Sequence, residues 1–163
     1  MSRELQNGMF AGFIAVAWMM LLFFLHQETS GLGLADPYVC VIVLSAFIYI
    51  TILRRRDTDL HGHLSVKEGL MAGIVTAFMA GIMIGVYKMV YVKYINPEIV
   101  DEVIAQAQSF YRTSGGTAAQ IKNAGDSARV MYSAFGQFTY GIGITMLLGG
   151  IVSLICSVIM RRE

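Results

Sequence analysis

The sequence is poor in charged residues and in cysteine. Charged residues make up 14% of its 163 positions, whereas a soluble domain carries about 25%. The formal net charge is only +1, so the chain lacks the basic field that binds nucleic acid. Its two cysteines, Cys40 and Cys156, both lie inside apolar runs and are expected to be small buried side chains rather than a disulfide or metal pair. These shortages argue against an ordinary soluble domain.

Motifs with a known chemistry are also missing. The sequence contains no nucleophile elbow, phosphate-binding loop, HExxH or CxxCH motif. His26 lies at the end of the first apolar run, at an interface, and His61 and His63 lie in a loop, so they are not placed to face one another inside the bilayer and hold a haem. No carboxylate lies inside a predicted span, which argues against an ordinary proton-coupled carrier. We therefore expect no catalytic residue and no cofactor, and the chain is not expected to be an enzyme.

What the sequence does contain is a series of long apolar runs. Hydrophobic residues make up 56% of the chain, and the mean hydropathy is +0.62. The runs cover residues 8–26, 38–54, 66–95 and 134–160. A run of about 17–25 apolar residues crosses a bilayer as a helix, and the first is long enough to be an uncleaved helix rather than a signal peptide. We predict one all-α membrane domain over residues 1–163, with four transmembrane helices and a helical extracytoplasmic insertion at residues 96–133.

The positions of basic residues predict the orientation. One side of the predicted spans is flanked by basic residues: Arg3, the triplet 54–56, Lys67 and the pair 161–162. On the other side, residues 26–37 contain no Lys or Arg. Cytoplasmic loops of membrane proteins carry an excess of Lys and Arg. Both termini and the loop after the second span are therefore expected in the cytoplasm.

Small residues recur every four positions in the third and fourth runs. Residues four apart lie on one face of a helix, and close backbone approach through small residues is a main way for membrane helices to associate. We expect two helix-packing ridges that cross each other, although a glycine-lined route for a solute is an alternative. The predicted packing residues are Gly69, Gly73, Ala77, Gly81 and Gly85 in the third run and Gly141, Thr145, Gly149 and Ser153 in the fourth.

Two polar regions near the outer ends of these spans have their own predictions. The third run ends in the interface anchors Tyr87, Lys88, Tyr91, Lys93 and Tyr94, which are typical of an aromatic belt with snorkelling lysines. In the fourth run, Gln137, Thr139 and Tyr140 could form a polar spot at the outer mouth or hydrogen-bond one another across helices.

The loop between the second and third runs holds alternating acids and histidines: Asp57, Asp59, His61 and His63. On an extended chain this alternation would direct all four side chains to one side, where they could bind a divalent metal. Short loops of Asp and His are commonly just solvated turns. The four residues are thus weak metal candidates, and no metal site is predicted.

Capping signals divide the rest of the chain into helices. Ser65 with Glu68, and Thr117 with Gln120, are predicted capping boxes. Residues 96–97, Asn-Pro, are expected to be the N-cap and first position of a helix at 98–112 with an apolar stripe. That stripe could lie on the membrane surface, dock on a partner or pack on its own bundle.

The stretch SVKEGLMAGIVTAFMAG, with the later YKMVYVKYINPE, resembles a bacterial family of small four-span membrane proteins, domain-of-unknown-function family forty-one ninety-nine. The shared features are a basic stop, a K-E-G start to the third span, an aromatic-rich end closing on I-N-P, an outer helical insertion and a basic end to the fourth span. Here they are residues 54–56, Lys67-Glu68-Gly69, residues 87–94, Ile95-Asn96-Pro97, residues 96–133 and residues 161–162. The resemblance implies a multi-pass protein of the bacterial inner membrane and carries no activity or catalytic residue.

These observations favour a non-catalytic accessory or structural subunit of a larger homo- or hetero-oligomeric membrane complex. Its expected partners are membrane lipids and other membrane subunits or a second copy of itself, and no nucleic acid. A small oligomeric transporter or pore, or a lipid- or quinone-binding membrane protein, is the alternative. A membrane enzyme or electron carrier is favoured least.

Overall fold

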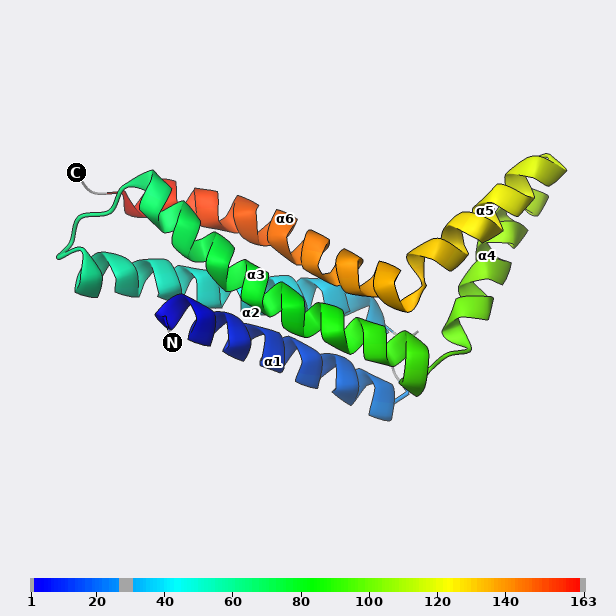
Figure 1. The fold of residues 1–163 in the computed structure, drawn as a ribbon, viewed down its shortest axis with the longest axis horizontal. Helices are drawn as coiled ribbons and strands as arrows, with labels where there is room; N and C mark the ends of the chain where they lie inside the picture. The colour runs from blue at the N-terminus through cyan, green and yellow to red at the C-terminus, as the bar shows by residue number, and fades with distance from the viewer. Residues whose placement is uncertain (1, 27–30, 162–163) are drawn as a thin grey trace. The chain divides into compact units, whose positions relative to one another are not determined.

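The computed structural model describes residues 2–26 and 31–161, and the elements in them are helices (Figure 1). The α-helices are α1 (Arg3–Phe24), α2 (Gly31–Arg54), α3 (Val66–Val90), α4 (Ile99–Thr113), α5 (Ala118–Met131) and α6 (Ala134–Met160). Two π-helical turns, η1 (Arg55–Asp59) and η2 (Tyr91–Ile95), continue α2 and α3. The predicted all-α fold is confirmed.

Four of these helical stretches are long and apolar enough to cross a membrane. They are Arg3–Phe24, Ala35–Asp59, Val66–Ile95 and Ala134–Met160. The last two have 30 and 27 residues, and a helix needs only about 20 to span the hydrocarbon core. The chain is therefore a membrane protein, as the sequence predicted.

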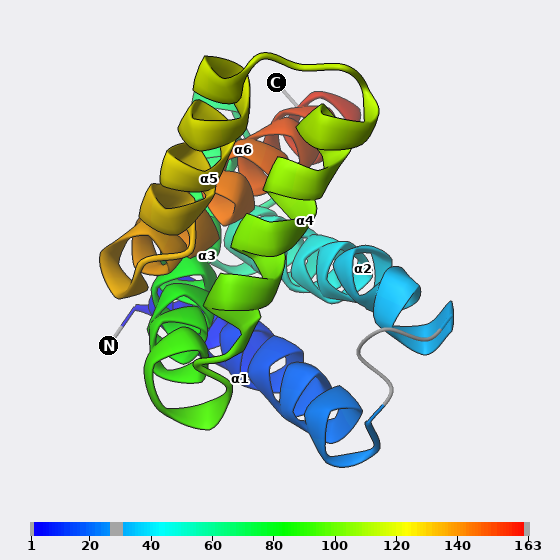
Figure 2. The same cartoon turned by 90° about the vertical axis from the view of Figure 1, so that its right-hand side faces the viewer.

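The chain divides into two compact units. The first is made of Met1–Ile84 and Ile142–Glu163 and holds α1, α2 and most of α3 and α6, which lie alongside one another (Figures 1 and 2). The second is Gly85–Gly141, in which α4 and α5 form an antiparallel hairpin (Figure 2). Each unit is described by itself below.

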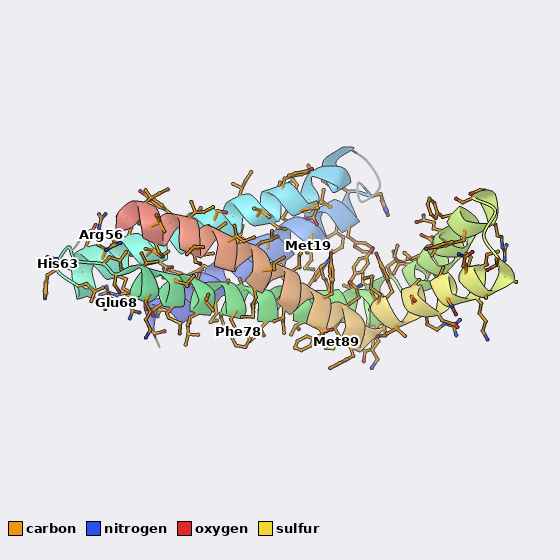
Figure 3. The ribbon with its side chains drawn as sticks, turned by 90° about the horizontal axis from the view of Figure 1, so that it is seen from above. Met19, Arg56, His63, Glu68, Phe78 and Met89 are labelled. Carbon is orange, nitrogen blue, oxygen red and sulfur yellow. The ribbon has the colours of Figure 1, made fainter. Side chains whose placement is uncertain are left out.

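The core of the four-helix unit is centred on α2 and α3. Ile48 and Ile52 of α2 and Ala77 of α3 have no exposed surface. Phe78, the next residue of α3, points away from the core and is 44% exposed (Figure 3). Such an outward apolar side chain costs little in a bilayer, because lipid tails are as apolar as the core. Close packing, rather than the hydrophobic effect, must therefore hold these helices together.

In the second unit, α4 packs on α5. Gly125 of α5 is buried, and a Cβ atom at that position would lie 3.2 Å from Cδ of Gln108 on α4. The apolar residues Ile99 and Val103 of α4 are partly buried, whereas Phe110 is 66% exposed. Helix α4 thus packs on α5, and the location of its exposed apolar residues, on the membrane, on a partner or on the bundle, stays a prediction.

Both predicted capping boxes are confirmed. At the start of α3, the Ser65 N–H donates to Glu68 Oε2 (3.0 Å) and the Glu68 N–H donates to Ser65 Oγ (3.3 Å). At the start of α5, the Thr117 N–H donates to Gln120 Oε1 (2.8 Å) and the Gln120 N–H donates to Thr117 Oγ1 (3.3 Å). Each box satisfies two backbone donors that the first helical turn leaves without partners.

The predicted N-cap at Asn96 is wrong. Helix α4 begins at Ile99, and Glu98 is its N-cap without a side-chain hydrogen bond. The Asn96 N–H donates to the Tyr91 carbonyl (2.8 Å), and its side-chain Nδ2 donates to the Tyr91 hydroxyl (3.0 Å). Asn96 therefore closes the end of η2, and its side chain is already engaged with the preceding helix.

The predicted extended loop after the second span is also wrong in its first half. Asp57 and Asp59 lie in the π-helical turn η1, so they do not alternate with the histidines along an extended chain. His61 and Gly62 follow with positive φ angles of 52° and 93°. The helix continues past the arginine triplet because its charged side chains form ion pairs there, as described below.

The second span begins earlier than the sequence argument placed it. Helix α2 starts at Gly31 and contains Pro37, which membrane helices tolerate because neighbouring groups re-satisfy the freed backbone. The candidate spans consequently include Asp36 and also Glu4 of α1. Asp57, Asp59 and Glu68 also lie within the candidate spans, so the prediction that spans contain no carboxylate is wrong. Residues 31–37, which the sequence argument placed in a turn, are the first residues of α2, and residues 27–30 of that turn lie outside the described residues.

Candidate functional site

The two predicted ridges of small residues meet each other where α3 contacts α6. A Cβ atom on Gly69 would lie 2.5 Å from Ser157 Oγ, and one on Gly73 would lie 2.6 Å from Ser153 Cβ. One turn further along, Gly149 of α6 lies directly against Ala77 of α3. Such distances are shorter than normal carbon contacts of about 3.5–4.0 Å. The α3–α6 seam therefore exists only because these positions have small side chains or none.

The seam is filled rather than hollow. A Cβ atom on Gly81 would lie 3.2 Å from Ile142 Cα and 3.4 Å from Thr145 Cβ. Ser153 and Ser157 are fully buried and donate to carbonyls of their own helix, at Gly149 (2.5 Å) and Ser153 (2.6 Å). Along this stretch, atoms of α6 occupy the space that a glycine-lined solute route would need.

The outermost members of the ridges belong to the second unit. Gly85 and Gly141 are both buried there. Gln137, which continues the α6 ridge outward, is 6% exposed and donates from Nε2 to the Met131 carbonyl (3.1 Å). The polar group of Gln137 is thus satisfied by nearby backbone, and Thr139 likewise donates to the Gly136 carbonyl (3.0 Å).

A third helix uses small residues against α3. A Cβ atom on Gly8 of α1 would lie 2.7 Å from Met79 Cβ, and one on Gly12 would lie 2.6 Å from Met83 Cβ. The short GxxxG at the start of the first run is therefore a contact between α1 and α3. Because α6 packs on another side of α3, this helix is the common partner of its neighbours in the first unit.

A buried polar cluster joins α1, α2 and α3. Asn7 Nδ2 donates to Thr51 Oγ1 (2.8 Å), and Thr51 Oγ1 donates to the Phe47 carbonyl (2.7 Å). Thr76 Oγ1 donates to the Ala72 carbonyl (3.0 Å) and lies 3.4 Å from Thr51 Oγ1. Asn7, Thr51 and Thr76 are 8%, 3% and 0% exposed. Each of these three side chains therefore has a hydrogen-bond partner, as burial requires.

Ion pairs extend the cluster to the end of the unit. Arg55 Nη1 pairs with Glu4 Oε1 (2.5 Å), and Arg3 Nη1 pairs with Asp59 Oδ1 (3.2 Å). The first pair is the more buried, with the Glu4 side chain 13% and the Arg55 side chain 35% exposed. Both pairs link the start of α1 to η1, the turn that continues α2. They give partners to Arg55 and Asp59, which the sequence argument placed in a loop.

The weak metal candidates are not gathered into a site. Asp57 Oδ1 pairs with Arg56 Nε (2.6 Å), and Asp59 pairs with Arg3. In the described part of the chain, no three His, Cys, Asp or Glu side chains lie close enough together to hold a metal ion. Figure 3 places Arg56 and His63 at the end of the unit where α2 passes into α3.

The predicted interface anchors form contacts in the second unit. The rings of Tyr87 and Tyr91 lie 6.0 Å apart. Lys88 Nζ lies 5.8 Å from the centre of the Tyr140 ring, and Lys93 Nζ lies 5.1 Å from the centre of the Tyr94 ring. A lysine near an aromatic face gains a modest cation–π attraction.

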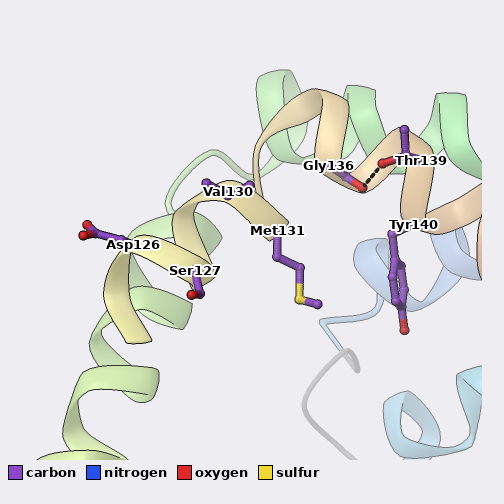
Figure 4. Close-up of a pocket in the computed structure, with 7 residues that line it drawn as sticks. All are labelled: Asp126, Ser127, Val130, Met131, Gly136, Thr139 and Tyr140. Atoms are coloured by element: carbon purple, nitrogen blue, oxygen red, sulfur yellow. Dashed lines mark hydrogen bonds between the residues drawn. The ribbon is translucent and has the colours of Figure 1, made fainter. Parts of the chain in front are cut away.

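A shallow groove of about 710 Å³ follows the junction of α5 and α6 (Figure 4). Its lining is largely apolar, including Val130 and Met131, which are 72% and 54% exposed. Tyr140 forms one end of the groove, and Asp126 lies at the other (Figure 4). Within it, Thr139 bonds the backbone of its own helix. The groove therefore offers an apolar surface with few available polar groups.

The comparison with family models places the chain among known sequences. A family described as "Protein of unknown function (DUF4199)" matches residues 6–162. The chain belongs to this family. No curated protein and no solved structure matches it. The expected resemblance is therefore confirmed, and the family carries no activity that could be transferred.

The motifs that carry the DUF4199 resemblance have structural roles in this chain. In the K-E-G start of α3, Glu68 completes a capping box and Gly69 lies against Ser157. In the I-N-P stretch, Asn96 closes the end of η2. Of the basic pair that ends the fourth span, Arg161 follows α6 directly, and residue 162 lies outside the described residues.

Sequence reasoning missed the polar cluster. The sequence argument gave no role to Glu4 or Asn7, which precede the first apolar run, and Thr51 and Thr76 resemble ordinary residues of apolar spans. An available signal was that Glu4 and Asn7 lie three apart, which places them on one helical face. The identity of their partners on other helices is not contained in that spacing.

Proposed function

We propose that this chain is a non-catalytic membrane subunit that assembles with another transmembrane helix, either from a different protein or from a second copy. The supporting observation is the outward side of α6. Gly143 and Gly150 have no atom within 4 Å of where a Cβ would lie. They are seven residues apart and thus nearly aligned on one helical face. Leu147, between them, is 62% exposed.

This face differs from the glycines that hold the unit together. Only 22% of the most apolar stretch of α6 is buried, compared with 50% of that of α3. Helix interiors disfavour glycine unless a backbone must approach closely, and membrane helices associate through such small positions. The two glycines leave depressions on either side of the exposed Leu147 side chain. A partner helix could pack into these depressions more closely than lipid chains could.

The test compares two glycines of α6 that face away from the unit with one that faces α3. Gly143→Leu and Gly150→Leu should reduce assembly, measured by native mass spectrometry and by co-purification in mild detergent, while the melting temperature stays near that of the wild type. Gly149→Leu is the matched control, because its side chain would run into Ala77 and should lower the melting temperature. A wild-type chain that is strictly monomeric and purifies alone would overturn the proposal.

We also propose that the protein lies in a bacterial inner membrane with both termini in the cytoplasm. Arg3, the arginines at 54–56 and Arg161 flank one side of the spans, and Lys and Arg are in excess on the cytoplasmic side of membrane proteins. The turn between α4 and α5 should then lie outside. In a chain with Cys40 and Cys156 replaced by serine, Ser114→Cys in intact cells should react with a membrane-impermeant maleimide, and Thr58→Cys should not. The reverse labelling pattern would refute the orientation.

A further inference from the structure

We propose that the groove between the start of α3 and the end of α6 binds the headgroup of an aminophospholipid, a lipid that carries both a phosphate and a primary ammonium group. The groove has a volume of about 500 Å³, within the range of roughly 300–1,000 Å³ typical of small-molecule sites. Its lining includes Leu60, His63, Leu64, Val66, Glu68 and Arg161. This proposal does not depend on the assembly proposed above.

The depth of the groove matches a lipid headgroup. Three candidate spans end or begin beside it, at Asp59, Val66 and Met160. The lining residues therefore lie where helices leave the hydrocarbon core and enter the layer of phosphates. The bottom of the groove is closely packed, since Leu64 is 1% exposed and belongs to the hydrophobic core. Apolar Leu60 and Val66 lie beside the polar residues, as a glycerol backbone and the first acyl carbons would require.

The groove presents charges of both signs. Arg161 supplies a guanidinium group, which suits phosphate because it donates several hydrogen bonds in a fixed plane. Glu68 supplies a carboxylate, and both of its hydrogen bonds from Ser65 end on Oε2. The second carboxylate oxygen, Oε1, therefore keeps lone pairs that can accept from an ammonium group.

A purely anionic headgroup would match this lining less well. Its phosphate could pair with Arg161, but it carries no cation that could pair with the Glu68 carboxylate. Lys67, an exposed cation between the lining residues Val66 and Glu68 in the sequence, would attract any anionic lipid to this end of the protein. Selection of an ammonium-bearing headgroup must therefore come from Glu68, while binding of the phosphate comes from Arg161.

The two roles can be separated by conservative variants. Glu68→Gln removes the charge and still permits a capping box, because Gln serves that position as Glu does. Arg161 is exposed and lies just beyond the end of α6, so Arg161→Gln leaves the packed core unchanged. Arg54→Gln is the control, an exposed cation that does not line the groove.

The experiment uses the full chain, delipidated in detergent and titrated with phosphatidylethanolamine, phosphatidylglycerol or phosphatidylcholine, with retained lipid counted by native mass spectrometry. The wild type should retain phosphatidylethanolamine over the other two by on the order of tenfold, the factor that about 1.4 kcal/mol represents. Glu68→Gln should abolish the preference over phosphatidylglycerol. Arg161→Gln should weaken retention of both lipids, and Arg54→Gln should leave the preference unchanged.

Several results would overturn the proposal. One is equal or tighter retention of phosphatidylglycerol by the wild type. Another is an unchanged preference in Glu68→Gln, and a third is full retention by Arg161→Gln. Soluble glycerophosphoethanolamine, which lacks acyl chains, should bind much more weakly than the lipid. If it bound equally well, the groove would be a site for the free headgroup and the assignment to a membrane lipid would be wrong.

Discussion

Substituting Gly73 by alanine tests whether the α3–α6 seam holds the four-helix unit together. The added methyl carbon would lie 2.6 Å from Ser153 Cβ and 3.2 Å from Ile48 Cγ2, whereas carbon atoms prefer about 3.5–4.0 Å. Ser153 is fully buried and belongs to the α6 ridge. Neither neighbour is the free end of a long flexible side chain, so α6 itself must shift by close to 1 Å.

The expected magnitude follows from the cost of overpacking a core, which is about 1–3 kcal/mol. Alanine also favours the helix over glycine by up to about 1 kcal/mol in water, and this gain would hide part of the cost. Gly143→Ala has the same intrinsic gain but meets no atom within 4 Å. The difference between the two variants therefore isolates the packing term, and Gly73→Ala should be the less stable by about 1–3 kcal/mol.

The assay is reversible unfolding in mixed micelles, followed by far-ultraviolet circular dichroism and by the fluorescence of Trp18, the only tryptophan. The double variant Gly73→Ala/Ser153→Gly should recover most of the loss, because it removes the atoms that the new methyl group meets. The coupling energy of this double-mutant cycle should be at least about 0.5 kcal/mol, as for residues in direct contact. Equal stability of Gly73→Ala and Gly143→Ala, or no coupling with Ser153, would refute the reasoning.

Three further predictions concern polar contacts, and each is measured by the same unfolding assay. Asn7→Ala should lower the free energy of unfolding by about 0.6–2 kcal/mol, the range for hydrogen bonds between membrane helices. The loss stays in this range because Thr51 keeps its bond to its own helix, and a larger loss would contradict this account of the cluster. Glu4→Gln should lower the free energy of unfolding by about 1–3 kcal/mol, a loss between those of exposed and buried ion pairs. Adding Arg55→Gln to this variant should lower it little further, because the ion pair is already broken. Thr117→Ala should destabilise α5 by about 1 kcal/mol, seen as faster amide exchange in that helix, and an unchanged exchange rate would contradict it.

Much of the fold could be predicted from the sequence because the determining signals are local. A long apolar run needs no knowledge of other segments to be identified as a span. The Ser65 and Thr117 boxes each depend on two residues three apart, and both formed as expected. Periodic small residues also identified the face of α3 that meets α6.

The errors occurred where distant residues decide the local structure. Asn96 has the composition of an N-cap, yet its side chain bonds Tyr91 of the preceding turn. Asp59 belongs to a helical turn and pairs with Arg3, 56 positions earlier. In both cases a tertiary contact competes with the local preference, and single-sequence reasoning has no means of weighing that competition. The buried cluster around Thr51 was missed for the same reason.

The central position of α3 has a consequence for biogenesis. Helix α3 contacts α1 where Met79 and Met83 meet Gly8 and Gly12. It contacts α2 where Thr76 meets Thr51, and α6 where Gly73 meets Ser153. Chains are synthesised from the N-terminus, so the first two helices enter the bilayer before the surface that accepts them has left the ribosome. We expect those helices to remain loosely associated beside the translocon until α3 inserts. A chain truncated before Val66 should accordingly be degraded rather than accumulate.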